Sequence, residues 1–116
     1  MFGEALAKGQ SVVVDNTSPQ AADRLKYISI ASRLGITIRC IWVTTPEAMA
    51  KHLNMFRNNF VTGAMVPGIA FNMYKSKVQE PQLSEGLAAV IRIDFAPSFD
   101  HLPAGAKQMF LETPAV

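Results

Sequence analysis

The residues best suited to chemistry follow a short β-branched run, in the stretch VVVDNTSP at positions 12–19. A carboxylate at the end of a parallel strand faces the crevice where ligands bind in α/β folds. Mg²⁺ in nucleotide sites keeps several waters, so one such carboxylate can hold it through water. Asp15 is therefore a candidate magnesium residue, and Asn16 and Thr17 are candidate donors to phosphate oxygens. The alternative is that all of them simply form a turn.

A second candidate lies on the helix expected after Pro46. At about 100° per residue, one side of this helix carries Lys51, Asn54, Met55 and Asn58. Its apolar face is expected to carry Met49, Leu53, Phe56 and Phe60. A lysine there could clamp a transferring phosphoryl group while charge spreads over its oxygens. The alternative is a solvated face with one lysine. Arg57 lies about 120° around the helix from Lys51 and could reach a loop or an acid as easily as a nucleotide.

Other chemistry finds little support in the sequence. It contains no GxSxG, CxxC or HExxH motif and no GxxxxGK[ST] phosphate-binding loop. Neither His52 nor His101 has neighbours at the spacing of metal ligands or beside a nucleophile. Lys75 and Lys77, beside Tyr74, could touch phosphate or be ordinary surface lysines. The candidate residues thus suit magnesium and phosphate, without the loop that would grip the phosphates.

Size and composition allow one small domain. The chain has 116 residues, of which 49% are hydrophobic, and its net charge of +2 does not by itself indicate a nucleic-acid-binding protein. The single cysteine, Cys40, excludes an internal disulfide, and we expect it to be a buried, reduced core residue of an intracellular protein. No apolar run approaches the roughly 20 residues of a membrane span, so we expect no membrane partner. The N-terminus does not have the pattern of a secretory signal.

The spacing of apolar residues and turn signals predicts alternating helices and strands. Helices are expected over residues 2–8, 19–34, 46–60 and 67–74, and strands over residues 11–14, 36–43 and 90–95. A loop is expected over residues 62–65, and Gly9 and Gly35 are the expected ends of the first two helices. Ser18 is the expected N-cap of the second helix, whose apolar face should carry Ala21, Leu25, Ile28 and Ala31. Strand, helix and strand in this order form a βαβ unit with parallel strands. The predicted fold class is α/β, with a parallel sheet flanked by helices.

Several short motifs occur in order along residues 5–95. They are VVVDNTSP at 12–19, AADR at 21–24 with Tyr27, Arg39-Cys40, KHLNMFR at 51–57, Val66-Pro67, Met73-Tyr74, Glu80-Pro81 and LSEG at 83–86. In this order they resemble the kinase domain of bifunctional polynucleotide kinase 3′-phosphatases, a family of P-loop kinases. Each motif alone is weak, whereas the ordered set is specific.

The resemblance implies a kinase that moves the γ-phosphate of ATP to a 5′-hydroxyl of DNA or RNA. Longer members add a 3′-phosphatase, and the family acts in nuclear repair of DNA breaks, where repair scaffold proteins are possible partners. By resemblance, Asp15 is the acid of the second nucleotide-binding motif, with a catalytic role and a role in holding Mg²⁺ through water. Lys51 belongs to the lid helix over the ATP phosphates and is the second catalytic candidate. Thr17 and Arg57 complete the set expected to bind ATP.

Two departures from the family pattern are visible. The family lid presents two basic residues four apart, but here the matching positions are Lys51 and Met55, and lysine does not replace arginine in bidentate contacts. The family's phosphate-binding loop and its general-base aspartate lie upstream of the matched segment. We therefore expect residues 1–95 to be the C-terminal portion of such a kinase domain, a partial P-loop NTPase fold lacking the phosphate-loop strand and helix. Residues 96–116 should form an irregular tail with a short helix over 107–111.

These departures leave open what the isolated chain does. We expect it to be catalytically inactive, to bind neither ATP nor Mg²⁺ by itself, and to be poorly stable. One alternative is a fragment of another P-loop kinase that acts on a nucleotide or small molecule, although the motifs between residues 66 and 86 favour the polynucleotide kinases. The other alternative is a non-catalytic nucleic-acid-binding or regulatory truncation, whose binding should weaken steeply with salt.

Overall fold

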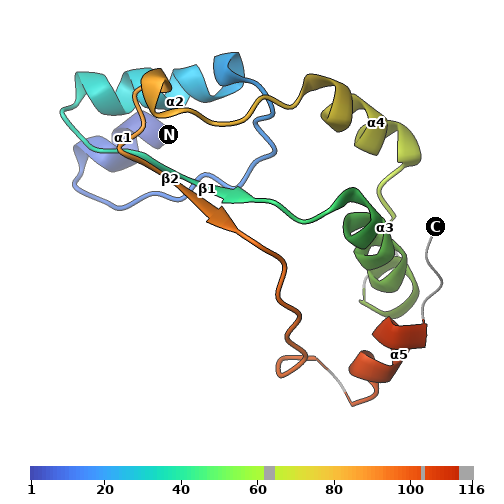
Figure 1. The fold of residues 1–116 in the computed structure, drawn as a ribbon. Coiled ribbons are helices and arrows are strands. Elements are labelled where there is room, and N and C mark those ends of the chain that lie inside the picture. Colours follow the sequence, from blue (N-terminus) through green and yellow to red (C-terminus); the bar gives the residue numbers. More distant parts are fainter. Residues whose placement is uncertain (62–64, 103, 113–116) are drawn as a thin grey trace. The chain divides into compact units, whose positions relative to one another are not determined.

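The computed structural model describes residues 1–61, 65–102 and 104–112. Its helices and strands, in chain order, are α1 (Phe2–Ala7), α2 (Ala21–Arg33), β1 (Arg39–Val43), α3 (Glu47–Phe56), the π-helical turn η1 (Arg57–Val61), α4 (Gly68–Lys77), the 3₁₀ turn η2 (Leu83–Glu85), β2 (Ala89–Ile93) and α5 (Ala106–Glu112) (Figure 1). The strands β1 and β2 pair with each other and run in the same direction. The α/β class and the parallel pairing predicted from the sequence are confirmed.

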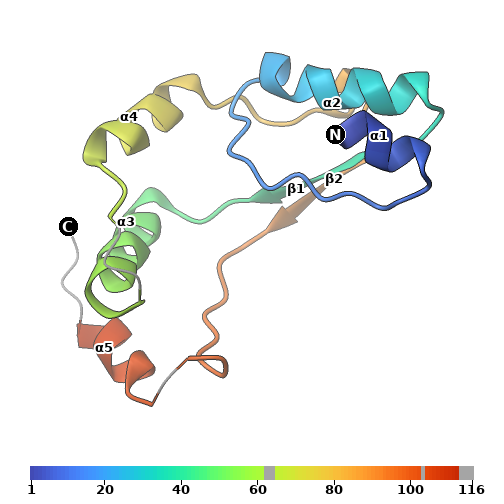
Figure 2. The ribbon, with the colours of Figure 1, turned by 180° about the vertical axis from the view of Figure 1, so that it is seen from behind.

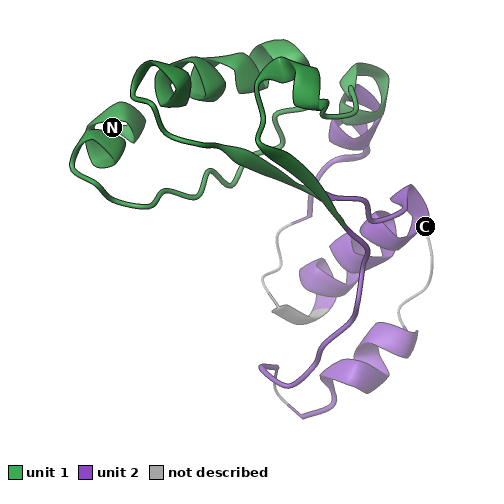
Figure 3. Ribbon diagram, turned by 60° about the vertical axis from the view of Figure 1, so that its left-hand side comes forward, with its two compact units in different colours: residues 1–42, 74–92 green, residues 43–73, 93–116 purple. Residues whose placement is uncertain are grey.

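The chain divides into two compact units, which are described separately (Figure 3). Unit 1 consists of Met1–Trp42 and Tyr74–Arg92, and unit 2 consists of Val43–Met73 and Ile93–Val116. Both units are therefore assembled from segments far apart in the sequence. The expected boundary at residue 95 stays a prediction.

In unit 1, helices α1 and α2 lie side by side on one side of the two strands (Figures 1 and 2). The rings of Phe2 and Tyr27 meet edge to face, with centroids 5.2 Å apart. Gly86 has a φ of 107°, and a Cβ added there would lie 2.9 Å from Cγ2 of Ile28. Glycine is therefore required both by the left-handed backbone and by the close approach of α2. The buried apolar residues of this unit include Leu6, Ile28, Ala31 and Leu87.

The strand expected at residues 11–14 does not form. This segment has no regular secondary structure, and the side chain of Val13 is 91% exposed. A strand exists only through hydrogen bonds to a neighbour, and the sheet in the described part of the chain pairs β1 with β2 alone. The expected strands at 36–43 and 90–95 form over Arg39–Val43 and Ala89–Ile93. The prediction for 11–14 was wrong because β-branched side chains favour a strand but do not provide the neighbouring strand with which it must pair.

Helix α2 begins later than its apparent capping signal. Gln20, not Ser18, is the N-cap, and it forms a capping box with Asp23. The helix ends as predicted, because Gly35 follows with a φ of 69°. The expected apolar face was wrong at one position, since Leu25 is 55% exposed. The buried face instead includes a charged residue, Arg24, which is 8% exposed.

The expected helix after Pro46 forms as α3 and continues into the π-helical turn η1. Phe56 is buried, and Met49 and Leu53 pack against it, as their spacing predicts. The side chain of Phe60, expected on the same face, lies outside the described part of the chain, as does most of the loop expected at 62–65. The helix expected from Pro67 forms as α4 and extends three residues beyond Tyr74 to Lys77.

Aromatic residues form the core of unit 2. Phe110 of α5 lies with its ring centroid 5.7 Å from that of Phe56 and 5.4 Å from that of Phe99. The short helix predicted at 107–111 therefore exists and packs against α3. The helices that the structure describes are too short or too polar to cross a membrane.

Candidate functional site

The turn that carries Asp15 connects the irregular segment after α1 to the start of α2. Asp15, Asn16 and Thr17 are exposed, and the backbone N–H of Thr17 donates to Oδ1 of Asn16 at 2.9 Å. Ser18 has a φ of 36°, a conformation that non-glycine residues seldom adopt. The carboxylate of Asp15 is thus open to solvent, at the end of a turn that closes in a strained conformation.

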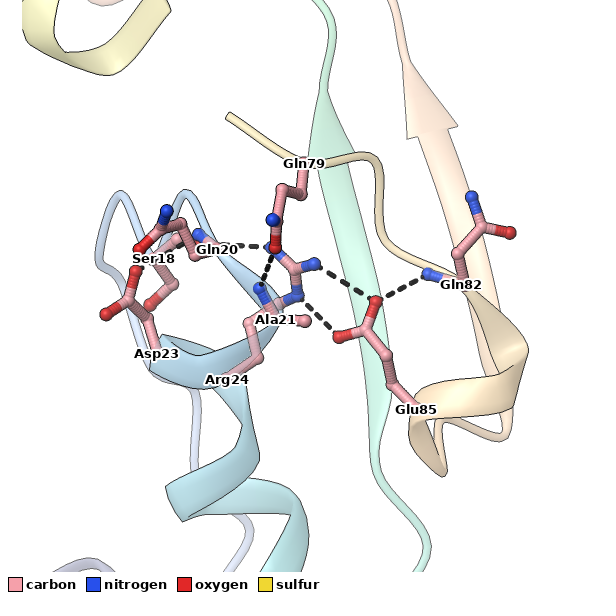
Figure 4. Close-up of polar contacts among 8 residues, drawn as sticks. All are labelled: Ser18, Gln20, Ala21, Asp23, Arg24, Gln79, Gln82 and Glu85. Carbon is pink, nitrogen blue, oxygen red and sulfur yellow. Dashed lines mark hydrogen bonds and ion pairs between the residues drawn. The ribbon is translucent and has the colours of Figure 1, made fainter. Parts of the chain in front are cut away.

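Arg24 anchors this turn to a distant part of unit 1 (Figure 4). Its Nε and Nη2 donate to Oε1 and Oε2 of Glu85 at 2.8 and 3.0 Å. Its Nη1 donates to the carbonyl oxygen of Ser18 at 2.9 Å. The side chains of Arg24 and Glu85 are only 10% and 13% exposed. This is a bidentate, charge-assisted pair with a third bond to the backbone, the geometry that makes arginine contacts strong and directional.

Further hydrogen bonds hold the first turn of α2. The backbone N–H of Gln79 donates to the carbonyl of Pro19 at 2.7 Å, and Oε1 of Gln79 accepts from the N–H of Ala21 at 2.9 Å. The N–H of Gln20 donates to Oδ2 of Asp23 at 3.0 Å. With the bond from Arg24 included, each residue from 18 to 21 has a backbone group that is hydrogen-bonded to another part of unit 1 or to Asp23.

The ion pair shifts the pKa values of both of its members. The hydrogen bonds from Arg24 lower the pKa of Glu85 below 4.5, against the opposing effect of burial. The same contact raises the pKa of Arg24. Cys40 of β1 is only half-buried, which corrects the expectation of a buried residue. Desolvation raises the pKa of its thiol although Arg24 partly opposes this, so Cys40 is a poor nucleophile at neutral pH.

In unit 2, the predicted lid lysine is paired within its own helix. Nζ of Lys51 lies 3.1 Å from Oε1 of Glu47, and the two side chains are 34% and 38% exposed. The ammonium group also lies 6.0 Å from the ring centroid of Phe71. A partly exposed pair one helical turn apart is weak, so the lysine can exchange its partner for another anion. Lys51 is therefore available to a phosphate that approaches α3.

Asn54 was expected beside Lys51 on a polar face, but the structure buries it. It is 6% exposed, its Nδ2 donates to the carbonyl of Val66 at 2.8 Å, and its Oδ1 accepts from the N–H of Val66 at 2.9 Å. Nη2 of Arg57 donates to the same Oδ1 at 3.2 Å. Asn54 thus ties the end of α3 to the segment before α4. Arg57 borders an open, mostly apolar hollow of about 440 Å³, which Leu53 and Phe71 also line.

Neither histidine nor acidic residues build a metal cage in the described part of the chain. Nε2 of His52 lies 2.7 Å from the carbonyl oxygen of Phe110 and connects α3 to α5. No group of three or more His, Cys, Asp or Glu residues converges among the residues that the structure describes. Mg²⁺ in nucleotide sites needs only one or two carboxylates besides phosphate oxygens and water. One exposed carboxylate is therefore enough for such a site, and Asp15 can supply it.

The structure places Asp15 and Thr17 in unit 1 and Lys51 and Arg57 in unit 2. Their roles in catalysis, ATP binding and magnesium binding stay predictions. Sequence reasoning missed the ion pair that holds the turn. A signal was present, because Arg24 lies four residues before Ile28 on the buried face of α2, and a buried charge requires a partner. The partner, Glu85, is 61 positions away and follows only from the fold.

Parallel strands flanked by helices define the α/β fold class. Comparison with known families specifies this class further. The AAA domain family matches residues 1–81, which is more than half of the chain, and the chain belongs to this family of P-loop-type domains.

Two relatives carry the same name. The bifunctional polynucleotide phosphatase/kinase of Schizosaccharomyces pombe is 42% identical over 92 residues, which cover 79% of this chain and 22% of that protein. The putative bifunctional polynucleotide phosphatase/kinase of Acanthamoeba polyphaga mimivirus is 36% identical over 94 residues, which cover 78% of this chain and 22% of that protein. The resemblance to the polynucleotide kinases is confirmed, and the chain spans about a fifth of the length of these relatives.

Proposed function

We propose that the protein to which this chain belongs is an ATP-dependent polynucleotide 5′-hydroxyl kinase that also has a 3′-phosphatase. The observation that carries the proposal is the similarity of 92 residues to a relative named as a bifunctional polynucleotide phosphatase/kinase. The match of residues 1–81 to a P-loop-type family supports assignment of this segment to the kinase half. The substrate would be a 5′-hydroxyl end of DNA or RNA.

We assign separate tasks in such an enzyme to residues of each unit. The exposed carboxylate of Asp15 would accept hydrogen bonds from waters on Mg²⁺, and the hydroxyl of Thr17 would donate to a phosphate oxygen. Lys51 would exchange Glu47 for the phosphates of ATP, with Arg57 as a second cation near the same helix. The bound Mg²⁺ would neutralise charge that develops on the β- and γ-phosphates.

In the proposed transfer, the 5′-oxygen of the polynucleotide bonds to the γ-phosphorus while the bond to the ADP oxygen breaks, and the hydroxyl proton passes to a base. By resemblance, that base is an aspartate upstream of the matched segment. The printed sequence contains no GxxxxGK[ST] loop, whose backbone amides and lysine position the β- and γ-phosphates. We therefore expect no turnover from the 116-residue chain alone.

The proposal extends to the cellular role. A kinase and 3′-phosphatase together make broken DNA ends ligatable, so we propose a role in DNA end repair, a nuclear location and contact with repair scaffold proteins. Immunofluorescence with an antibody against residues 96–112 would test the location. An exclusively non-nuclear signal would contradict that part of the proposal.

The first experiment is to purify the native protein from its source cells and to measure its intact mass and its kinase activity. A 5′-hydroxyl oligonucleotide, a mononucleotide and a small alcohol would be offered with ATP and Mg²⁺. We expect only the oligonucleotide to accept phosphate. In the whole protein, Asp15→Asn should lower kcat/KM by about 100-fold or more, since each precisely placed electrostatic group contributes that much. Asp100→Asn changes another exposed carboxylate and should have no effect.

Other outcomes would overturn the proposal in recognisable ways. Phosphorylation of the mononucleotide alone would identify a different P-loop kinase. A native species near 12.7 kDa that binds single-stranded DNA without turnover would identify a non-catalytic product. Binding of that kind should weaken steeply as salt is raised.

A further inference from the structure

We propose that Arg24 and Glu85 are positioning residues, which set the place of Asp15 by holding the turn at residues 15–18. The inference rests on the proposed function, because it assigns a task to the turn that carries the predicted magnesium residue. Neither side chain is expected to touch substrate. Their effect passes through the carbonyl of Ser18, which Arg24 binds at 2.9 Å.

The first support is the way Arg24 divides its donors. Two nitrogens, Nε and Nη2, are used on Glu85, and the third, Nη1, is used on Ser18. The planar guanidinium fixes the angle between these contacts, so the position of Glu85 determines the position of the Ser18 carbonyl (Figure 4). A lysine would keep the charge and lose this geometry.

The second support is the backbone of Ser18. Its φ of 36° is unfavourable for a residue with a side chain, and such conformations persist only where the surroundings determine them fully. The surroundings here are the bonds from Arg24 to Ser18 and from Gln79 to Pro19. Without them the turn would relax, and Asp15, three residues away, would move with it.

The third support is that the side chain of Asp15 is exposed, so burial does not hold it in place. Asp15, Asn16 and Thr17 are all exposed, so packing does not determine where the carboxylate lies. The mostly buried ion pair bonds to this turn through the carbonyl oxygen of Ser18. Glu85 is itself held, since its Oε2 accepts from the backbone N–H of Gln82 at 2.7 Å.

The test uses the whole protein and separates positioning from stability. Arg24→Lys keeps the positive charge and removes the planar guanidinium that bonds to both Glu85 and Ser18. The double variant Arg24→Glu/Glu85→Arg restores an opposite-charge pair but takes the guanidinium away from the carbonyl of Ser18. Arg33→Lys, on an exposed site of the same helix, is the matched control.

Amide hydrogen exchange, without nucleotide, is the first measurement. We expect exchange in the peptide 15–21 to be about tenfold faster in Arg24→Lys and in the double variant, as for the loss of one charge-assisted hydrogen bond. Exchange in the strand Ala89–Ile93 should not change in the double variant. The second measurement is titration with ATP in the presence and absence of Mg²⁺. The gain in affinity that Mg²⁺ provides should fall about tenfold in both variants, as for other outer-sphere substitutions.

Two results would overturn the inference. One is a double variant with wild-type exchange at 15–21 and a wild-type magnesium effect, because the pair would then act only through stability. The other is Arg24→Lys with the same values as Arg33→Lys, a result that stays informative if the double variant does not fold. Failure of the proposed function looks different, since the wild-type protein would then phosphorylate no 5′-hydroxyl end while the exchange results still stood.

Discussion

The two units hold their helices by different means. In unit 1 a buried ion pair between Arg24 and Glu85 connects α2 to the 3₁₀ turn before β2. In unit 2 an aromatic cluster around Phe110 connects α5 to α3. The hydrophobic effect is strong but non-directional, whereas a bidentate ion pair fixes the relative orientation of its two groups. The comparison indicates that the ion pair of unit 1 holds a particular backbone atom, the carbonyl oxygen of Ser18, whereas the aromatic cluster of unit 2 mainly buries apolar area.

The largest effect expected from this comparison concerns the aromatic cluster. Phe110→Ala removes a ring that is 9% exposed and should cost about 3–5 kcal/mol, enough to release α5. Amide exchange in residues 106–112 would report the release. Leu111→Ala is the control, because that side chain is 65% exposed and its loss should change stability by less than about 0.5 kcal/mol. Equal effects of the two variants would show that α5 is not held by the cluster.

Removal of only one member of the ion pair should lower the free energy of unfolding by nearly as much. Glu85→Ala leaves the buried guanidinium of Arg24 without a counter-ion and should lower the free energy of unfolding by about 3 kcal/mol. The double variant Arg24→Met/Glu85→Leu should recover most of that loss, because no charge then remains buried. Urea unfolding of the whole protein, followed by circular dichroism, measures both. A double variant as unstable as the single one would mean that the pair contributes more than the neutralisation of its charges.

A smaller effect, specific to unit 1, is expected from pH. The folded-state pKa of Glu85 lies below its ordinary value of 4.5, so its contribution to stability is complete above pH 4.5 and is lost as pH falls through the lowered pKa. The urea midpoint of the wild type should therefore drop more than that of Glu85→Gln between neutral pH and about pH 3. Parallel curves for the two proteins would show that Glu85 does not contribute to the acid sensitivity.

The smallest effect on stability is expected from the pair on α3. Glu47→Gln removes a partly exposed partner of Lys51 and should change stability by about 0.3–0.5 kcal/mol. The same variant should leave ATP affinity unchanged or improve it, since Lys51 is released from its competing carboxylate. Thermal unfolding and ATP titration on one preparation would test both parts. A marked loss of ATP affinity would contradict the proposed role of Lys51.

Local signals in the sequence predicted the helices and the ends marked by glycine. Gly9 and Gly35 both adopt a positive φ where a helix stop was expected. The failures share a physical cause, which is dependence on distant residues. The β-branched run at 11–14 has no pairing partner, and the charge of Arg24 is buried only because Glu85, 61 positions later, reaches it. Asp15 was proposed as a site residue from its position alone, and that role stays a prediction. The ion pair that bonds to its turn could not be predicted, because Glu85 follows only from the fold.

The segment from Gln79 to Glu85 has a consequence for how sequences of this kind can diverge. Gln79 bonds to Pro19 and Ala21 at one end of the segment, and Glu85 bonds to Arg24 at the other, so both ends reach the first turn of α2. Insertion or deletion of a single residue between them would break one set of bonds. Among related sequences this connection, although it has little regular secondary structure, should therefore keep a constant length while its exposed side chains vary.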